Sequence, residues 1–176
     1  MSTYTVADID AALVRENFKG VTFLDIQPLL KDPKLSAALV DFMAAALPKN
    51  IWEETDFIGG LEARGFVLAG MLSVRLGKGQ LLIRKAGKLP GDIVTKTYKT
   101  EYSQDQIEVQ KGSGTIVLVD DVLATGGTLS SASELVEAAG YDLKAKLVMA
   151  NLTFLNQDRE TASILQYGPG VELIRT

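Results

Sequence analysis

The order of apolar and polar positions along the chain predicts short strands that alternate with helices. Runs of apolar residues predict strands at residues 21–26, 56–60, 81–83, 115–119, 145–153 and 171–174. Apolar residues recur at helical spacing over about 5–16, 33–47, 65–76, 127–139 and 157–166. Because strands and helices alternate in this way, the pattern predicts an α/β fold with a mostly parallel sheet.

Turn-forming residues mark several of the expected boundaries. Asp32 followed by Pro33 is typical of a helix start, with Asp as the N-cap and Pro at the first helical position. Gly77 and Gly140 stand where two helical patterns stop. The run Thr115–Val119 lacks the alternation of a half-exposed strand, so we expect a strand that is buried on both faces.

Residues 84–111 differ from the rest of the chain in charge. The first sixteen of them carry five basic side chains and one acidic one, a local net charge of +4 in a chain of net charge −4. A Lys-Leu-Pro-Gly turn at 88–91 precedes two strand-like pieces near 92–98 and 106–110. The segment therefore combines a pair of short strands with a positive field that suits an anion.

Composition narrows the chemistry that the chain can perform. The 176 residues are 47% apolar and 23% charged, which is ordinary for a globular protein, and the length suits a single domain over residues 1–176. The chain contains no Cys and no His, so disulfides, thiol nucleophiles, imidazole catalysis and most zinc sites are excluded. Any reaction must rely on carboxylates, Lys, Arg, hydroxyls, backbone N–H groups or a hard metal ion.

Net charge and the N-terminal residues limit the expected partners and location. A net charge of −4 argues against a general nucleic-acid binder. Residues 1–8 lack the basic and apolar regions of a signal peptide, and no apolar run approaches the ~20 residues of a membrane-spanning helix. We therefore expect a cytoplasmic protein without nucleic-acid or membrane partners.

The strongest local signal is an apolar strand followed by a turn of small residues and a helix. Asp120 and Asp121 stand at the end of the strand, where α/β sheets bind their ligands. In the turn that follows, Ala124–Thr128, the backbone N–H groups and the helix N-terminus can together cradle a phosphate. Gly126 and Gly127 allow the backbone to approach that phosphate closely.

Polar side chains extend this candidate phosphate site. Thr125 and Thr128 add hydroxyl donors, and the two Asp carboxylates can accept sugar hydroxyls or hold water on Mg²⁺. Neither a G-x4-G-K-[ST] loop nor a G-x-G-x-x-G motif occurs, which argues against a P-loop or a Rossmann dinucleotide site. An ordinary capped turn between strand and helix remains the alternative interpretation.

The same turn resembles a loop of a known enzyme family. Asp120-Asp121 followed by Ala124–Thr128 is similar to the ribose 5-phosphate loop of the type I phosphoribosyltransferases. Within that family, Gly60–Phe66 resembles the pyrophosphate loop of the adenine-specific members, and Ile83–Gly91 resembles their basic segment. The resemblance runs in chain order from about residue 18 to 140.

Two further segments resemble the same adenine-specific group. Glu101-Tyr102 is similar to the Glu-Tyr pair of the mobile catalytic loop. Phe23–Ile26, together with Leu29–Pro33, is similar to the N-terminal hood that binds adenine. The sequence departs from the family pattern at Leu24, where Arg is common, and at Ser103, where Gly is common.

The resemblance implies a fold, a reaction and an assembly. The fold is a parallel sheet flanked by helices, with a small hood over about residues 1–30 and a mobile flap over about 92–110. The reaction forms AMP and pyrophosphate from adenine and 5-phospho-α-D-ribose 1-diphosphate, called phosphoribosyl pyrophosphate below, in purine salvage. Mg²⁺ would arrive on the donor, with Asp120 and Asp121 reaching it through water, and the protein would be a homodimer.

The resemblance also implies roles for individual residues. Arg64 on its glycine-flanked turn is expected to be a free forked donor for pyrophosphate. The basic segment, through Arg84, Lys85 and Lys88, would neutralise the same leaving group. Glu101 would handle a proton on the purine ring, beside the substrate-binding Tyr102.

Base recognition is implied by a further set of positions. Phe23 and Val122 would sandwich the flat base, and the backbone of residues 22–24, with Leu24, would read its amino edge. Enzymes for 6-oxopurines carry an Asp where Ala124 stands, so this position favours adenine. Two other functions remain open: a phosphoribosyltransferase for another purine, and a non-catalytic regulator that senses phosphoribosyl pyrophosphate.

Overall fold

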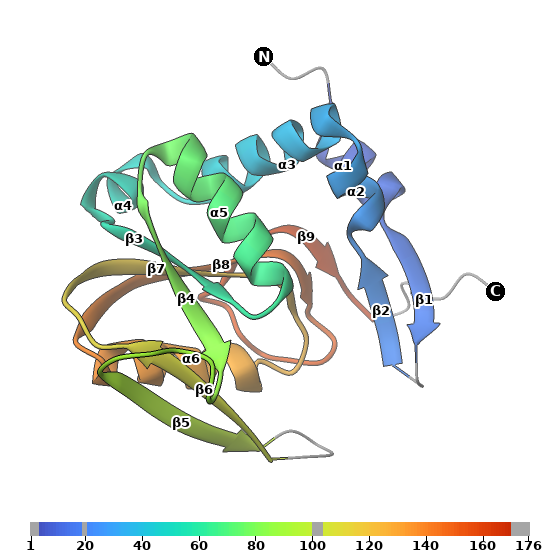
Figure 1. Ribbon diagram of the computed structural model, residues 1–176. Helices are drawn as coiled ribbons and strands as arrows, with labels where there is room; N and C mark the ends of the chain where they lie inside the picture. The colour runs from blue at the N-terminus through green and yellow to red at the C-terminus, as the bar shows by residue number, and fades with distance from the viewer. Residues whose placement is uncertain (1–3, 19–20, 100–103, 170–176) are drawn as a thin grey trace.

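The computed structural model describes residues 4–18, 21–99 and 104–169. Within these ranges, seven strands form one sheet in the order β5-β6-β4-β3-β7-β8-β9 (Figure 1). Their bounds are β3 Phe57–Leu61, β4 Gly79–Lys85, β5 Ile93–Lys99, β6 Gln104–Gln110, β7 Gly114–Leu123, β8 Tyr141–Leu152 and β9 Ala162–Tyr167. β4, β3, β7, β8 and β9 run parallel, whereas β6 and β5 join antiparallel at one edge. The expected α/β fold with a mainly parallel sheet is confirmed.

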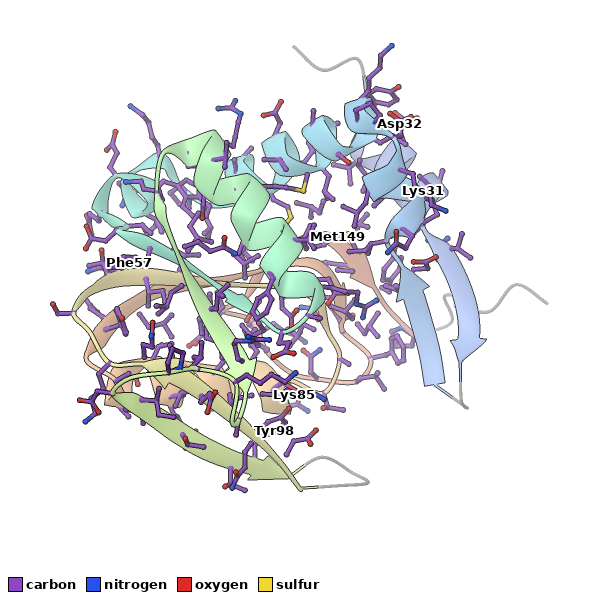
Figure 2. All side chains as sticks on the ribbon, in the orientation of Figure 1. Lys31, Asp32, Phe57, Lys85, Tyr98 and Met149 are labelled. Atoms are coloured by element: carbon purple, nitrogen blue, oxygen red, sulfur yellow. The ribbon has the colours of Figure 1, made fainter. Side chains whose placement is uncertain are left out.

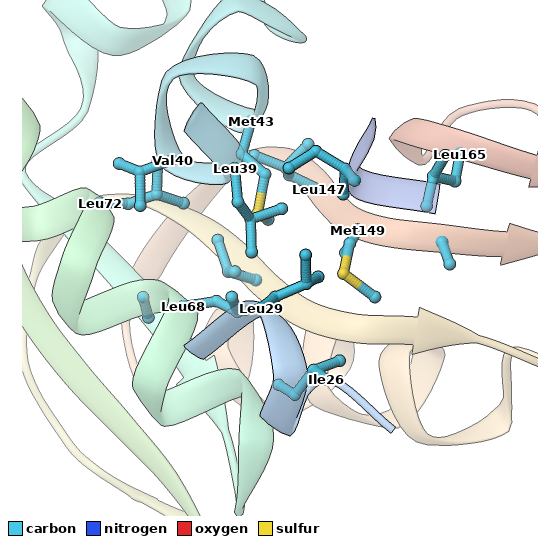
Figure 3. Packing of buried hydrophobic residues seen from close by; sticks show 14 of the residues in the cluster. Ile26, Leu29, Leu39, Val40, Met43, Leu68, Leu72, Leu147, Met149 and Leu165 are labelled. Carbon is cyan, nitrogen blue, oxygen red and sulfur yellow. The ribbon is translucent and has the colours of Figure 1, made fainter. Parts of the chain in front are cut away.

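Helices cover both faces of this sheet. α3 (Pro33–Ala45) and α5 (Arg64–Leu76) lie on one face, and α6 (Gly127–Ala138) lies on the other (Figure 1). On the first face, Leu39 of α3 and Leu68 of α5 belong to the same buried cluster as Met149 of β8 (Figure 3).

β7 lies between two separate apolar cores. Val117 and Val119 belong to the core under α3 and α5, whereas Ile116 and Leu118 belong to the core under α6. All four side chains are fully buried. Burial on both faces explains why this strand is continuously apolar rather than alternating.

The N-terminal segment forms a small unit beside the sheet. It contains α1 (Val6–Ala12), the antiparallel pair β1 (Val14–Phe18) and β2 (Val21–Asp25), and α2 (Gln27–Lys31). Arg15 pairs with Asp10 and lies over the ring of Tyr167 at the end of β9. These contacts tie β1 to the β9 edge of the seven-stranded sheet (Figure 1).

The direction of chain progression changes between β3 and β7. β3 is followed by α5 and β4 on one side, and β7 is followed by α6 and β8 on the other. Open α/β sheets bind ligands outside the carboxyl ends of their strands at such a switch point. β3 pairs with β7 only as far as Gly60 opposite Val119, while β7 stays paired with β8 up to Leu123. Asp120 and Asp121 therefore lie beyond the last pair that β7 forms with β3.

One expected helix is shorter than predicted, and a second is absent from the described residues. The first, over 5–16, ends at Ala12, because the residues from Val14 onward pair with β2 instead. The second, over 157–166, does not form: β9 pairs in parallel with β8 from Ala162 onward. Asp158 accepts the backbone N–H groups of Glu160 and Thr161, so the chain before β9 is held in a side-chain turn.

Other boundaries also differ from the prediction. β7 runs from Gly114 to Leu123, so Asp120 and Asp121 lie inside the strand rather than after it. The short helices α2 and α4 (Lys49–Glu54) are missed by the apolar spacing because each spans little more than one turn. The strand expected at 171–174 lies outside the described residues. In the described part of the chain, no helix is long and apolar enough to span a membrane.

Candidate active site

The turn between β3 and α5 brings the N-terminus of α5 against β7. A Cβ atom on Gly60 would lie 2.7 Å from the carbonyl oxygen of Gly65, and one on Gly65 would lie 2.8 Å from that of Val119. Neither position has room for a side chain, so glycine is required at both. Arg64, the first residue of α5, is thereby held beside the carboxyl end of β7.

Arg64 connects three parts of the fold. Its Nε atom lies 2.8 Å from Oδ2 of Asp121, and its Nη1 atom donates to the carbonyl oxygen of Leu24 at 2.7 Å. Asp121 is only 5% exposed, so this ion pair is screened far less than one on the surface. The prediction of a free Arg64 is therefore wrong, because the guanidinium already joins β2, α5 and β7.

The two adjacent carboxylates of β7 are in an unfavourable environment. Burial and the charge of Asp121 raise the pKa of Asp120 well above its usual value. Burial also raises the pKa of Asp121, although the Arg64 charge opposes the shift. The Oδ1 atom of Asp120 accepts the backbone N–H of Asp121 at 2.9 Å. A ligand that offers hydroxyl donors or positive charge would relieve this cost of burial.

The turn after β7 leaves the first N–H groups of α6 without a side-chain cap. Gly126 is the N-cap, with φ of 88°, a conformation that favours glycine. In contrast, Thr5 caps α1 and Asp32 caps α3 through side-chain oxygens. An uncapped, positively polarised helix end next to the switch point is the feature expected of an anion site.

The Glu62 carboxylate contacts three residues of the basic segment at the end of β4. Its carboxylate lies 2.8 Å from Lys88 Nζ and 3.4 Å from Arg84 Nε, and it accepts the Lys85 backbone N–H at 2.9 Å. The hydrogen bond from Lys88, helped by the Lys85 N–H and the Arg84 charge, lowers the pKa of Glu62 to about 2 despite burial. The side chain of Lys85 is exposed at the strand end (Figure 2).

Glu108 on β6 is a positioning residue that the sequence does not reveal. Its carboxylate accepts the backbone N–H groups of Gly87, Lys88 and Leu89 at 2.6 to 2.8 Å. The residue is 1% exposed. Burial alone would raise the pKa of Glu108, but the three N–H donors outweigh it and the pKa is lowered. This buried charge fixes the path of the turn that carries Lys88.

The remaining predicted residues are distributed as follows. Val122 is half-buried against the core under α3 and α5. The side chain of Leu24 is buried, so only its backbone is available for recognition. Glu101, Tyr102 and the side chain of Phe23 lie outside the described residues. Among the residues that are described, no group of three acidic side chains could hold a metal ion.

Comparisons with a family model and with individual proteins indicate the same family. A sequence model described as a phosphoribosyl transferase domain matches residues 29–161. The adenine phosphoribosyltransferase of Bdellovibrio bacteriovorus is 42% identical over 153 residues, which cover 84% of this chain and 90% of that protein.

Solved structures show the same relationship. The adenine phosphoribosyltransferase of Saccharomyces cerevisiae, complexed with an imino-altritol bisphosphate and adenine, superposes with a TM-score of 0.83 at 33% identity, covering 90% of this chain and 97% of that one. The enzyme of Trypanosoma brucei, in complex with AMP, pyrophosphate and ribose 5-phosphate, gives 0.74 at 30% identity, covering 85% and 68%.

Proposed function

The chain belongs to the phosphoribosyltransferase family, and on this premise we propose that it forms AMP and pyrophosphate from adenine and phosphoribosyl pyrophosphate. It is a purine-salvage transferase. The relatives from S. cerevisiae and T. brucei bind adenine and the products AMP and pyrophosphate, respectively. The single observation that carries the assignment to a site is the contact of Arg64 with Asp121 beside the uncapped end of α6.

We assign the parts of the donor by their chemistry. The 5′-phosphate would bind the backbone N–H groups of the turn 124–128, with the Thr125 and Thr128 hydroxyls beside it. The ribose hydroxyls would donate to the carboxylate oxygens of Asp120 and Asp121, whose pKa values are raised by burial.

The pyrophosphate group would lie on the other side of the switch point. Arg64 stands at the end of β3 and can turn its forked donors to phosphate oxygens. Arg84 and Lys88 would then divide their charge between Glu62 and the leaving group, with Lys85 exposed beside them. The net positive charge of this segment stabilises the negative charge that develops as pyrophosphate departs.

The reaction exchanges one bond to C1′ of the ribose for another. The C1′–O bond to pyrophosphate breaks with its electron pair, and N9 of adenine forms the new C1′–N bond. A proton leaves the purine ring, and we assign its transfer to Glu101. The donors of Arg64 and of the turn 124–128 would hold the reacting carbon between base and leaving group.

Magnesium is assigned to the donor rather than to a resident site. Mg²⁺ is usually held by one or two carboxylates together with substrate phosphates and waters. The pair Asp120 and Asp121 suits that arrangement, since Asp121 is buried, Asp120 is half-buried, and among the described residues only Asp121 forms an ion pair, with Arg64. The metal would supply charge neutralisation to the pyrophosphate when bound.

The preference for adenine rests on the absence of a carboxylate at position 124. Ala124 offers no carboxylate to the N–H and carbonyl edge of a 6-oxopurine, and Phe23 with Val122 would supply the flat apolar surfaces. Carbonyl groups of residues 22–24 would accept from the amino group of adenine. Since Arg64 already donates to the Leu24 carbonyl, adenine must share or replace that contact.

A homodimer in the cytoplasm completes the proposal. The outer faces of α3 and α5 form an apolar groove of about 820 Å³ whose lining includes Phe66, Val67, Met71 and Val74. Val74 is 87% exposed, a large apolar side chain that a second copy could cover. Sedimentation of the wild type and of Val74→Asp tests this assembly, and a wild-type monomer would contradict it.

An assay with each purine in turn tests the function. Phosphoribosyl pyrophosphate and Mg²⁺ are incubated with adenine, hypoxanthine or guanine, and nucleotide and pyrophosphate are measured. We expect AMP to form with kcat/KM far above that for either 6-oxopurine. Faster use of hypoxanthine would favour an enzyme for another purine. Binding of phosphoribosyl pyrophosphate without turnover of any base would favour the non-catalytic sensor.

A further inference from the structure

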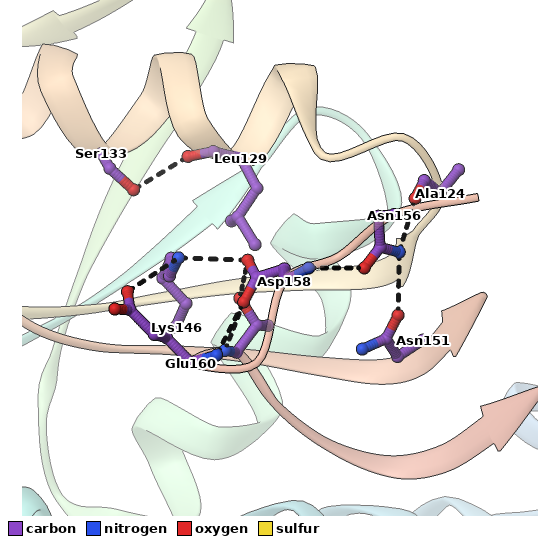
Figure 4. A network of polar contacts seen from close by, with 9 residues as sticks. Ala124, Leu129, Ser133, Lys146, Asn151, Asn156, Asp158 and Glu160 are labelled. Carbon is purple, nitrogen blue, oxygen red and sulfur yellow. Dashed lines mark hydrogen bonds and ion pairs between the residues drawn. The ribbon is translucent and has the colours of Figure 1, made fainter. Parts of the chain in front are cut away.

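The loop that follows β8 contacts the candidate phosphate turn. The Nδ2 atom of Asn156 donates to the carbonyl oxygen of Ala124 at 2.7 Å and lies 3.0 Å from Oδ1 of Asn151 (Figure 4). It also lies 3.0 Å from the carbonyl oxygen of Leu152. Asn151 is only 3% exposed. One amide group therefore joins the end of β8 to the first residue of the turn.

The loop is itself held in place by a second set of contacts. Asn156 Oδ1 accepts the backbone N–H of Asp158 at 3.1 Å. The Asp158 carboxylate then accepts from the Thr161 hydroxyl, from the backbone N–H groups of Thr161 and Glu160, and from Lys146 Nζ, at 2.7 to 3.2 Å (Figure 4). These hydrogen bonds lower the pKa of Asp158 to about 2, against the effect of burial. These hydrogen bonds therefore hold the loop that carries Asn156 in one conformation.

The planarity of the peptide bond transmits this restraint toward the ligand. The carbonyl of Ala124 and the N–H of Thr125 belong to one peptide unit, and in a trans peptide they point in opposite directions. When Asn156 fixes the carbonyl on the loop side, the Thr125 N–H is directed away from the loop. Within the described residues, no protein group accepts from that N–H, and Thr125 is exposed.

We propose that Asn156 is a positioning residue for the 5′-phosphate: it sets the orientation of the Ala124–Thr125 peptide so that its N–H faces the phosphate. This inference rests on the proposed function. The ligand class is a ribose 5-phosphate ester, whether phosphoribosyl pyrophosphate, AMP or ribose 5-phosphate itself. Pyrophosphate alone, assigned to the region of Arg64 and Glu62, should not depend on Asn156.

Calorimetric titration separates these two ligand classes. Ribose 5-phosphate, AMP and pyrophosphate with Mg²⁺ are titrated into the wild type, Asn156→Ala and Thr153→Val. Thr153 lies on the same loop, and within the described part of the chain its hydroxyl donates only to the carbonyl of Tyr167, so the Val variant is the matched control. Loss of a single oriented N–H contact predicts about five- to tenfold weaker binding of the two phosphate esters to Asn156→Ala.

The outcomes are distinguishable. We expect pyrophosphate to bind Asn156→Ala within about twofold of the wild type, which shows that the variant is folded, and Thr153→Val to bind all three ligands normally. Equal loss for pyrophosphate and the esters would overturn the inference, because it would indicate general damage. If Asn156→Ala does not fold, Asn156→Asp keeps the acceptor for the Asp158 N–H and lacks the donor, and unchanged ester binding there would overturn it. A wild type that binds no ester would defeat the proposed function itself.

Discussion

Two sets of buried or half-buried carboxylates lie at the carboxyl edge of the sheet, and their environments differ. Glu62 and Glu108 are surrounded by donors: Lys88, Arg84 and backbone N–H groups lower both pKa values. In the second set, Arg64 forms an ion pair with Asp121, and burial raises the pKa values of both Asp120 and Asp121. Charges of the first set are satisfied within the protein, whereas those of the second set are only partly satisfied.

The difference indicates different tasks. A carboxylate with three or more donors stabilises the fold when it is ionised, so Glu62 and Glu108 organise the basic segment. A carboxylate that is buried beside a like charge weakens the fold when it is ionised. Perturbation of this kind clusters at functional sites. Asp120 and Asp121 are therefore the pair suited to meet a ligand.

A carboxylate outside both sets, Glu101, should show the largest effect on rate. We assign it the ring proton, so Glu101→Leu should lower kcat roughly 10²–10⁴-fold, equal to about 3–5 kcal/mol. The free energy of unfolding should change by less than about 0.5 kcal/mol. Single-turnover measurement is the proper readout, because slow product release can mask a chemical defect. An unchanged single-turnover rate would remove Glu101 from the mechanism.

Glu108 should show the largest effect on stability. Glu108→Ala leaves three backbone N–H groups of residues 87–89 without their acceptor, and we expect a loss of about 3 kcal/mol in the free energy of unfolding. Urea denaturation measures it. Glu108→Gln keeps one acceptor oxygen and should lose less.

Exposed Glu134 offers a control for the Glu108 variants, since its pairing with Lys96 lies on the surface. Glu134→Ala should cost less than about 1 kcal/mol. If Glu108→Ala were no more destabilising than this control, the carboxylate would not be organising the basic segment.

The contrast between the two sets also marks what the sequence can predict. The turn 124–128 with its preceding Asp pair is contiguous, so its glycines and hydroxyls indicate a phosphate site directly. Glu108 and Asn156 act on residues 20 and 32 positions away, through contacts that only the folded sheet creates. No local pattern distinguishes Glu108 from any other strand residue. The expected free Arg64 fails for the same reason, since its partners lie on β2 and β7.

The helices and strands likewise divide into those that a local pattern predicts and those that tertiary contacts determine. Strands β3 and β7 and helices α3, α5 and α6 follow from runs and spacings in the sequence, because each is long or buried enough to leave a pattern. The segment 157–166 has helical spacing, yet the pairing of β9 with β8 and the turn at Asp158 determine its structure. Tertiary pairing of this kind overrides a weak local preference.

Removing the charge of Asp120 should change the free energy of unfolding in the opposite direction from removing that of Glu108. The folded-state pKa of Asp120 lies above the unfolded-state value, so the folded protein binds more protons and stability falls as pH rises through that interval. Asp120→Asn removes the charge while an amide oxygen can still accept the Asp121 N–H. We expect it to be about 1 kcal/mol more stable than the wild type at pH 8, and to have a higher KM for phosphoribosyl pyrophosphate. A destabilised variant with normal KM would show that Asp120 is structural.

Glu62 should give an effect as small as that of Asp120, with the opposite pH dependence. Its pKa is lowered to about 2 in the folded protein, so its contribution to stability is fully present above about pH 5 and is lost as pH falls toward 2. Because Lys88 is 45% exposed, solvent screens part of the pair, and we expect only about 1 kcal/mol. Thermal unfolding of the wild type and Glu62→Gln between pH 2 and 7 isolates this contribution, since Glu108 titrates in both proteins. The two stability curves should converge at the acid end and separate above pH 5. Parallel curves over the whole range would mean that Glu62 is not held ionised by Lys88, and the comparison with Asp120 would then rest on Glu108 alone.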